Sequence, residues 1–416
     1  MKKIKIFTLF SGYDSQLMGL IKAVKIIKKL FKAILVGWSD NDQNVQRIHN
    51  LTFPEYADRC YPDVTKIHWP GIPDFDILFY SSPCQSASRS GRREGFEQDS
   101  GTKSSLVWAV ENAIACKRPK WLILENVEGY LDPKNETTLI KWARTIASYG
   151  YASCFKVLNS ADFGIPQNRS RIFMISMRID DEKDFAFQWP MTKKLTVKPE
   201  NLLEDNVDDK YYLSTEMVAT YIDLLRNGRE GYKTKVNYSK KYPTKYLSSQ
   251  FIRKVSSTVT PLTKNGAIPT LQTMCGDTSL ATFANCGQEG KPCVVEVWEG
   301  KKGIQPVVIK SEKPSRQKPV VKKTPNGAER ILSIIDNLKE CQYLRVRRLT
   351  PKECLRFMGV EDMYIDRMLQ PYMHKGKSRK VSDYALYGRA GNSIVVNVLT
   401  ALFTSLIEQY PDSFGD

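Results

Sequence analysis

Three residues with chemically useful side chains each follow a short apolar run in the first third of the chain. Asp40 follows the second of these runs, Cys84 the third and Glu125 the fourth. A cysteine thiolate is a nucleophile, and a carboxyl group can act as a general acid or base or accept hydrogen bonds from a ligand. Gly12 lies in a turn of small residues after the first run, where the backbone leaves room for a cofactor. The sequence therefore predicts one site that combines a thiol, two carboxyl groups and a small-molecule pocket.

Cys84 has surroundings that distinguish it from an ordinary buried cysteine. An isolated cysteine is more often a small apolar core residue than a nucleophile. Here the segment 85–105 that follows is rich in glycine and serine and contains Arg89, Arg92 and Arg93. Nearby positive charge favours the thiolate over the thiol, and this composition is typical of a loop that covers a site. Both features favour a reactive cysteine.

The elements that must position these residues alternate between strands and helices. Apolar runs predict strands over 4–10, 33–38, 76–80, 121–124, 155–158 and 172–177. Apolar residues at helical spacing predict helices over 17–27, 106–114 and 136–149, the last ending at Gly150. This alternation predicts an α/β fold with a doubly wound, mostly parallel sheet. Ligands bind at the carboxyl ends of such strands, so Asp40, Cys84 and Glu125 should lie on one rim of the sheet.

The net charge is concentrated in one part of the chain. The 416 residues carry a formal charge of +17, and residues 231–350 hold 22 basic and 8 acidic side chains, which leaves only +3 elsewhere. A basic segment on a nearly neutral body is typical of a nucleic-acid-binding protein, although a solvated surface would show the same excess. No apolar run reaches the roughly 18 residues that a membrane-spanning helix requires, and we expect no signal peptide. Nine irregularly spaced cysteines fit a reducing compartment.

Changes in composition and hydrophobic patterning divide the sequence into three parts. Residues 1–190 form the α/β part, and 191–345 are rich in Tyr, Lys, Thr and Asn with patchy alternation, which predicts a second, smaller, basic and β-rich domain. Residues 346–416 return to helical patterning over 351–358 and 394–406. Cys275, Cys286 and Cys293 lack the spacing of zinc ligands, so we expect no metal site.

Four motifs occur in a fixed order along the chain. They are P-C-Q at 83–85, E-N-V at 125–127, Q-x-R-x-R at 167–171 and G-N-S at 391–393. Their order and spacing resemble those of the DNA (cytosine-5) methyltransferases of the single-chain bacterial or phage type. Further segments agree with that family, namely Phe10-Ser11-Gly12, Asp63-Val64 and Arg348-Leu349-Thr350-Pro351-x-Glu353-Cys354. Several positions depart from it. Thr8 replaces the usual aspartate, Asp14 a common glycine and Asp40 the usual glutamate, while Ala87 stands where an aromatic residue is usual and Val395 where a proline is usual.

The resemblance implies catalytic roles for four residues. Cys84 would add to carbon 6 of a cytosine that has been flipped out of the duplex. Glu125 would contact the ring N3 and the exocyclic amine. Arg169 and Arg171, on one face of an extended segment, would hold the base oxygen and a nearby phosphate.

The resemblance also implies an S-adenosyl-L-methionine pocket of the type found in methyltransferases that use this cofactor. Asp40 would bind the ribose hydroxyls and Asp63 the adenine amine. The remaining lining residues would be Phe10, Gly12, Ser82, Pro83, Asn392 and Ser393.

The implied partner is double-stranded DNA, read by the middle domain as a target-recognition domain. We expect a cytoplasmic monomer in a bacterium or phage-infected cell, with a restriction endonuclease as a partner in function only. A tRNA methyltransferase with the same pocket is an alternative, against which the long basic segment argues. A catalytically silent DNA-binding homologue would be expected to have lost Cys84, Glu125 or the paired arginines. A nicotinamide oxidoreductase would need G-x-G-x-x-G after the first strand, and Tyr13-Asp14-Ser15-Gln16 follows Gly12 instead.

Overall fold

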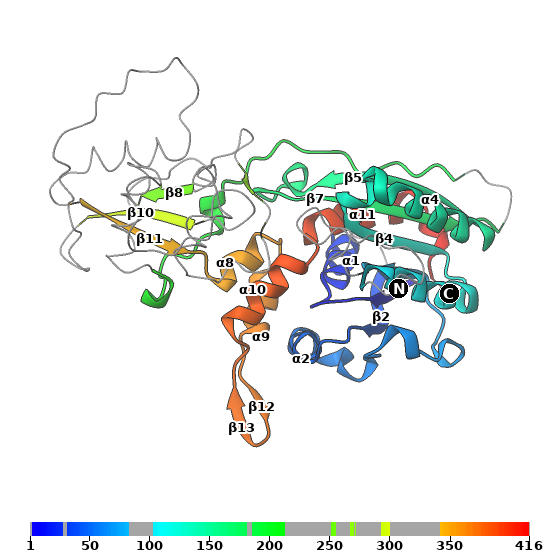
Figure 1. Ribbon diagram of the computed structural model, residues 1–416, viewed down its shortest axis with the longest axis horizontal. Helices are drawn as coiled ribbons and strands as arrows, with labels where there is room; N and C mark the ends of the chain where they lie inside the picture. Colours follow the sequence, from blue (N-terminus) through cyan, green and yellow to red (C-terminus); the bar gives the residue numbers. More distant parts are fainter. Residues whose placement is uncertain are drawn as a thin grey trace, which may run out of the picture.

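The structure is a computed structural model that describes residues 2–27, 31–82, 103–180, 185–212, 251–254, 267–269, 271, 293–299 and 342–415. Its main sheet has the strand order β2-β1-β3-β4-β7-β5 (Figure 1). The strands are β1 (Lys2–Leu9), β2 (Phe31–Ser39), β3 (Ile77–Tyr80), β4 (Trp121–Val127), β5 (Tyr151–Asn159) and β7 (Ser170–Arg178). Only β7 runs in the direction opposite to the other five strands, so its pairings with β4 and β5 are antiparallel. The predicted strands and the mostly parallel sheet are therefore confirmed.

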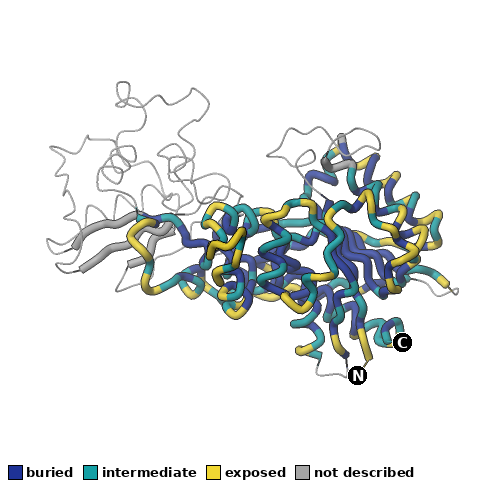
Figure 2. The backbone as a smooth tube through the Cα atoms, turned by 90° about the horizontal axis from the view of Figure 1, so that it is seen from below, coloured by how far each residue is buried: buried dark blue, intermediate teal, exposed yellow. Residues whose placement is uncertain are grey.

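Helices cover both faces of this sheet, and its strands are buried between them (Figure 2). Side chains of β3 alternate between two apolar clusters, with Ile77 and Phe79 in one and Leu78 and Tyr80 in the other. The first cluster includes α1 (Ser15–Ile26) and α11 (Val396–Gln409), and the second includes α3 (Glu111–Lys117) and α4 (Pro133–Ser148). A strand that is buried on both faces has an uninterrupted apolar sequence, which explains why these strands are readable from the sequence.

The helices of the first half differ in two ways from the prediction. The helix α2 (Gln43–Thr52) was not predicted, because it buries only Val45, Ile48, His49 and Thr52 and most of its other residues are polar. The helix predicted over 106–114 is a 3-10 helix, η4 (Lys103–Val110), followed by α3. Its β-branched and aromatic residues have low α-helix propensity. Gly150 has a φ of 83° directly after α4, which is consistent with the predicted stop.

The C-terminal part combines short helices with a hairpin. It contains α8 (Pro351–Arg356), α9 (Asp362–Met368), β12 (Tyr372–His374), β13 (Lys377–Arg379) and α10 (Asp383–Asn392) before α11. A capping box between Thr350 and Glu353 begins α8, and the buried Glu353 also pairs with Arg347 at 2.8 Å. The helix α11 packs on α1 so closely that a Cβ at Gly19 would lie 2.5 Å from the Cβ of Leu399. The chain therefore returns to the main sheet after residue 345.

Three strands of the middle part form a separate sheet beside α8, α9 and α10 (Figure 1). They are β8 (Phe251–Lys254), β10 (Cys293–Glu299) and β11 (Gln342–Arg348), so the predicted boundary at 345 falls inside β11. Residues 191–212 pack on the body, where Leu203 and Tyr211 are buried. A short pairing of β6 (Gln167–Asn168) with β9 (Ile268–Pro269) joins the middle part to the body. Most of 213–341 lies outside the described residues.

Short 3-10 helices connect many of these elements. Besides η4 they are η1 (Pro54–Arg59), η2 (Val64–Lys66), η3 (Trp69–Gly71), η5 (Glu128–Leu131), η6 (Ser160–Phe163), η7 (Pro199–Leu202), η8 (Asp209–Tyr211) and η11 (Pro411–Ser413). Among the described residues, no single helix has the length and hydropathy of a membrane span, and the bent pair α10–α11 passes that test only when its two helices are taken together.

Candidate active site

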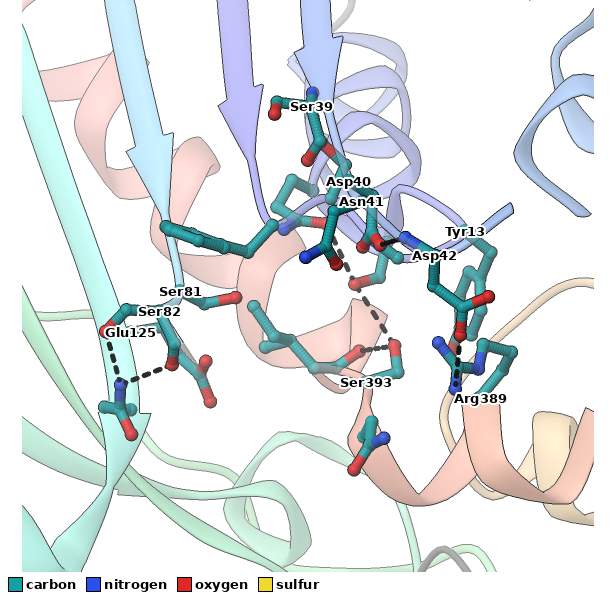
Figure 3. A pocket seen from close by; sticks show the side chains of 18 of the residues that line it. Tyr13, Ser39, Asp40, Asn41, Asp42, Ser81, Ser82, Glu125, Arg389 and Ser393 are labelled. Atoms are coloured by element: carbon teal, nitrogen blue, oxygen red, sulfur yellow. Dashed lines mark hydrogen bonds and ion pairs between the residues drawn. The ribbon is translucent and has the colours of Figure 1, made fainter. Parts of the chain in front are cut away.

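A cavity of about 430 Å³ lies at the carboxyl ends of β1, β2, β3 and β4 (Figure 3). This is the rim where ligands bind in open parallel sheets. The predicted site residues that line it are Phe10, Gly12, Asp40, Asp63, Ser82, Glu125, Arg169, Arg171, Asn392 and Ser393. Pro83 and Cys84 lie outside the described residues, directly after Ser82. The structure thus brings together every predicted site residue that it describes.

The turn after β1 is held in a conformation that most residues avoid. Phe10 has a φ of 57° and Gly12 a φ of 60°. A Cβ built on Gly12 would meet nothing within 4 Å, so the backbone faces open space there. The Gly12 N–H donates to Asp40 Oδ2 at 3.1 Å, which joins the turn to the end of β2. This arrangement lets a ligand approach the backbone closely.

Thr8 and Asp14, two of the departures from the family pattern, contact each other. The Thr8 hydroxyl donates to Asp14 Oδ2 at 3.1 Å, and Asp14 Oδ1 accepts from the Leu17 N–H to begin α1. Asp14 Oδ2 also lies 3.2 Å from His49 Nε2, and the His49 ring stacks on Trp38 at 3.7 Å. Asp14 is fully buried. These contacts fasten the turn to α1 and α2 from behind the cavity.

Asp40 is the carboxyl group nearest to the glycine turn. Its oxygens accept from the backbone N–H groups of Gly12 and Asp42, both at 3.1 Å. Burial raises the pKa of Asp40, and these two hydrogen bonds oppose the rise. The cap of α2 is Asp42 and not Asp40, since Asp42 Oδ1 accepts from Asn44 N–H at 2.8 Å. The Asp40 carboxyl group is therefore directed toward the turn and the cavity instead of toward a helix end.

Asp63 also lines the cavity but is engaged with its own turn. Its Oδ1 accepts from the backbone N–H of Thr65 at 3.0 Å and from the Thr65 hydroxyl at 2.7 Å, and these bonds lower the pKa of Asp63. Among the described residues, no group of three His, Cys, Asp or Glu side chains is placed to hold a metal ion.

Glu125 and Arg171 form an ion pair on the opposite wall of the cavity. Arg171 Nε lies 3.4 Å from Glu125 Oε1. The pairing of β4 with β7 places Val127 opposite Arg171, so Glu125 is the diagonal neighbour of Arg171 on the same face. Burial raises the pKa of Glu125, and the charges of Arg171 and Arg169 partly counter this effect. A buried carboxyl group with a raised pKa is suited to donate a proton near neutral pH.

Arg169 has different surroundings from Arg171. Its guanidinium donates to the carbonyl oxygens of Leu271 at 3.1 Å, Gly391 at 2.8 Å and Ser393 at 2.6 Å. Gln167 accepts from the Leu271 N–H at 2.9 Å and donates to the Phe357 carbonyl at 2.7 Å. Gln167 and Arg169 of the Q-x-R-x-R motif thus join the middle part and the C-terminal part to the wall of the cavity.

Sequence reasoning did not assign several residues that shape the site. Asn126 donates to the Ser82 carbonyl at 3.0 Å, and the Ser82 hydroxyl lies 3.1 Å from the Tyr130 hydroxyl, which fixes the chain directly before Pro83. Arg389 of α10 reaches Asp42 at 3.6 Å across the cavity mouth. Asn126 stands within the E-N-V motif, which was a usable signal. Arg389 had no such signal, because its partner Asp42, the N-cap of α2, lies 347 residues away in the sequence.

The fold and the cavity together define an α/β protein with a cavity at the carboxyl ends of its parallel strands. Residues 4–408 match the family of C-5 cytosine-specific DNA methylases. The chain belongs to that family, and its members are enzymes that methylate DNA.

Relatives of the same kind align along nearly the whole chain. A type II methyltransferase from Lactococcus lactis subsp. cremoris, M2.ScrFI, is 28% identical over 457 residues, covering 97% of this chain and 99% of its own length. The orphan methyltransferase M.SPRI of Bacillus phage SPR is 27% identical over 467 residues, with 99% of each chain covered. The structure of the Entamoeba histolytica methyltransferase EhMeth has a TM-score of 0.59 at 18% identity, covering 98% of this chain and 99% of that one. At this level of identity, the similarity to EhMeth shows that the two proteins share a fold.

Proposed function

We propose that the protein transfers a methyl group from S-adenosyl-L-methionine to carbon 5 of a cytosine in double-stranded DNA. The observation that carries this proposal is one cavity with two different walls. One wall holds the glycine turn and Asp40, which suit a nucleoside-like cofactor, and the other holds the buried pair Glu125–Arg171, which suits a polar base.

The cofactor wall fits the proposed ligand. A volume of about 430 Å³ lies in the range of small-molecule sites. Asp40 would accept from the ribose hydroxyls, Phe10, Gly12, Ser82 and Pro83 would line the pocket, Asp63 would face the adenine, and Asn392 and Ser393 would close the side formed by α10. When bound, S-adenosylmethionine would supply a methyl group on a sulfonium centre, which is the electrophile of the reaction.

The base wall would raise the reactivity of carbon 5. In the proposed reaction the Cys84 thiolate adds to carbon 6, the electron pair of the carbon 5–carbon 6 bond moves toward carbon 5, and Glu125 protonates N3. Methyl transfer to carbon 5 would leave the cofactor as a neutral thioether. Carbon 5 then loses its proton to water, the thiolate leaves carbon 6, which restores the double bond, and N3 returns its proton to Glu125. Arg171 would hold the base oxygen beside Glu125. Arg169 would help Arg171 to hold the base oxygen and a nearby phosphate. Its guanidinium also donates to the carbonyl oxygens of Gly391 and Ser393.

The proposed substrate is a base that has left the duplex. Cys84 and Glu125 cannot reach carbon 6 and N3 of a cytosine that is stacked and paired within the duplex, so the base would flip out into the cavity. Residues 191–345 would act as a basic, β-rich target-recognition domain, since residues 231–350 carry 22 basic and 8 acidic side chains. We propose a cytoplasmic monomer and a type II or orphan modification enzyme. A tRNA methyltransferase, the alternative, would transfer labelled methyl groups to tRNA and not to DNA.

Replacing Asp40 by Asn is expected to weaken binding of S-adenosylmethionine by about 10- to 100-fold, since a hydrogen bond to a charged group contributes roughly 1.5–3 kcal/mol. Asn has one acceptor oxygen where Asp40 uses two for Gly12 and Asp42. Isothermal titration calorimetry of each protein with the cofactor measures the change. The exposed Asp58→Asn in the same domain is the matched control and should bind with wild-type affinity. Equal affinity of both variants would remove Asp40 from the cofactor site.

A duplex that carries 5-fluorocytosine at the methylated position tests the proposed chemistry. Fluorine at carbon 5 cannot leave as a proton does, so the enzyme should remain joined to carbon 6 of the base after methylation. Mass spectrometry of the digested complex should find the adduct on Cys84. An adduct on another cysteine, or no adduct although the DNA is bound, would contradict the proposal.

A further inference from the structure

The hairpin β12–β13 carries a charge that nothing in the described structure balances. It projects away from the body beyond α10 (Figure 1). Residues 371–381 contain no Asp or Glu but include four cationic side chains and a histidine, namely His374, Lys375, Lys377, Arg379 and Lys380. All four cationic residues are exposed. The hairpin therefore concentrates positive charge on two short strands and the turn between them.

Basic residues of the neighbouring helices form ion pairs with carboxylate side chains. Lys352 lies 2.9 Å from Asp366, and Arg356 pairs with Asp362 at 2.5 Å. Arg389 on α10 pairs with Asp42. Within the described ranges, by contrast, no ion pair involves the four cationic residues of the hairpin. Like charges that are crowded without counter-charges repel one another, so this pattern lowers stability unless an anionic partner compensates for it.

The hairpin has a defined shape despite its exposure. Tyr372 pairs with Arg379 and His374 with Lys377, which leaves a two-residue turn. The turn residues Lys375 and Gly376 have φ values of 49° and 72°, as a type I′ turn requires. The guanidinium of Arg47 lies 4.8 Å from the centre of the Tyr372 ring and ties the base of the hairpin to α2. The charged strands are therefore held in a fixed direction relative to the cavity.

The connection to the cavity sets the reach of the hairpin. The helix α10 follows β13 closely and ends at Asn392, which lines the cavity. Ten helical residues extend about 15 Å and the three-residue strands about 10 Å, so placed end to end these elements span up to about 25 Å from Asn392 to the hairpin turn. At about 3.4 Å per base pair this distance corresponds to about 7 base pairs of duplex.

We infer that the β12–β13 hairpin is a second DNA-binding element that contacts backbone phosphates about 7 base pairs away from the target cytosine. The inference rests on the proposed function, which gives double-stranded DNA as the substrate. Lysine and arginine side chains on an exposed hairpin suit phosphate oxygens, and phosphate contacts position a protein without reading sequence. The hairpin would therefore add affinity and fix the direction of the duplex, while other parts of the protein select the base.

The test compares two variants that lose the same charge. One carries Lys375→Gln, Lys377→Gln, Arg379→Gln and Lys380→Gln in the hairpin. The control carries Lys3→Gln, Lys32→Gln, Lys141→Gln and Lys156→Gln, four exposed positions on other surfaces of the main domain. Binding of each full-length protein to a mixed-sequence duplex of about 40 base pairs, enough to span the expected contact on both sides, is measured over a series of salt concentrations.

The hairpin variant should bind more weakly, and its slope of log affinity against log salt should be smaller than that of the control by up to about 3.6, since each phosphate contact contributes about 0.9. The difference should shrink on duplexes that extend only about 5 base pairs on each side of the methylated cytosine. Equal slopes and affinities for the two variants would overturn the inference. The comparison of slopes on the mixed-sequence duplex is made without methyl transfer, so its result is independent of whether the proposed reaction occurs.

Discussion

Replacing Glu125 by Gln is expected to lower the rate of methyl transfer by about 10²- to 10⁴-fold, the usual contribution of a positioned proton donor. Glu125 is buried beside Arg171, and burial raises its pKa. A carboxyl group with a raised pKa remains protonated to a higher pH and can protonate N3 of cytosine. Gln keeps the size and polarity of the side chain but supplies no acidic proton, so the loss should appear in kcat more than in KM.

The pH dependence gives this prediction a second readout. In the wild type, the protonated Glu125 is lost as the pH rises through its raised pKa, so the rate should fall on the alkaline side. The Glu125→Gln variant should lack that fall, because an amide does not titrate. The exposed Glu136→Gln on α4 is the matched control and should retain the rate and pH profile of the wild type. An unchanged profile in Glu125→Gln would assign the proton to another group.

Replacing Cys84 by Ser is expected to reduce turnover by at least about 10⁴-fold, the order of effect seen when a covalent nucleophile is removed. A serine hydroxyl is far less ionised and less nucleophilic than a thiol at neutral pH, so carbon 6 of cytosine would not be attacked. Binding of DNA and of S-adenosylmethionine should remain close to the wild type, since Ser differs from Cys by one atom. Single-turnover assays and calorimetry separate the two effects.

The exposed Cys116→Ser is the control for this change, because Cys116 lies on α3 and does not line the cavity. It should retain wild-type turnover. Substantial methyl transfer by the Cys84→Ser protein would exclude Cys84 as the nucleophile, whereas a loss of DNA binding would indicate a structural role.

The sequence predicts the central sheet well because its strands are buried on both faces. Ile77, Leu78, Phe79 and Tyr80 all point into apolar layers, so the strand is a continuous apolar run. The residues at the ends of such strands then converge on one rim, as Asp40 and Glu125 do. A strand-end position and a residue type are both visible in the sequence.

The contacts that complete the site were not predictable in the same way. Arg169 donates to Leu271 and Ser393, which lie 102 and 224 residues further along the chain. No local pattern encodes such contacts, since they depend on how separate parts dock. The hairpin β12–β13 was missed for a different reason, because its short exposed strands lack the apolar pattern on which prediction relies, and α2 has only three aliphatic residues to signal a helix.

The central claim is tested most directly by incubating the protein with S-adenosylmethionine that carries a labelled methyl group and with unmethylated genomic DNA. The account predicts that the label enters DNA, and that mass analysis of the digested nucleosides finds it in 5-methylcytosine. Sequencing of the methylated positions would then give the target site. Label in tRNA instead of DNA, in another nucleoside, or in neither nucleic acid would contradict the account.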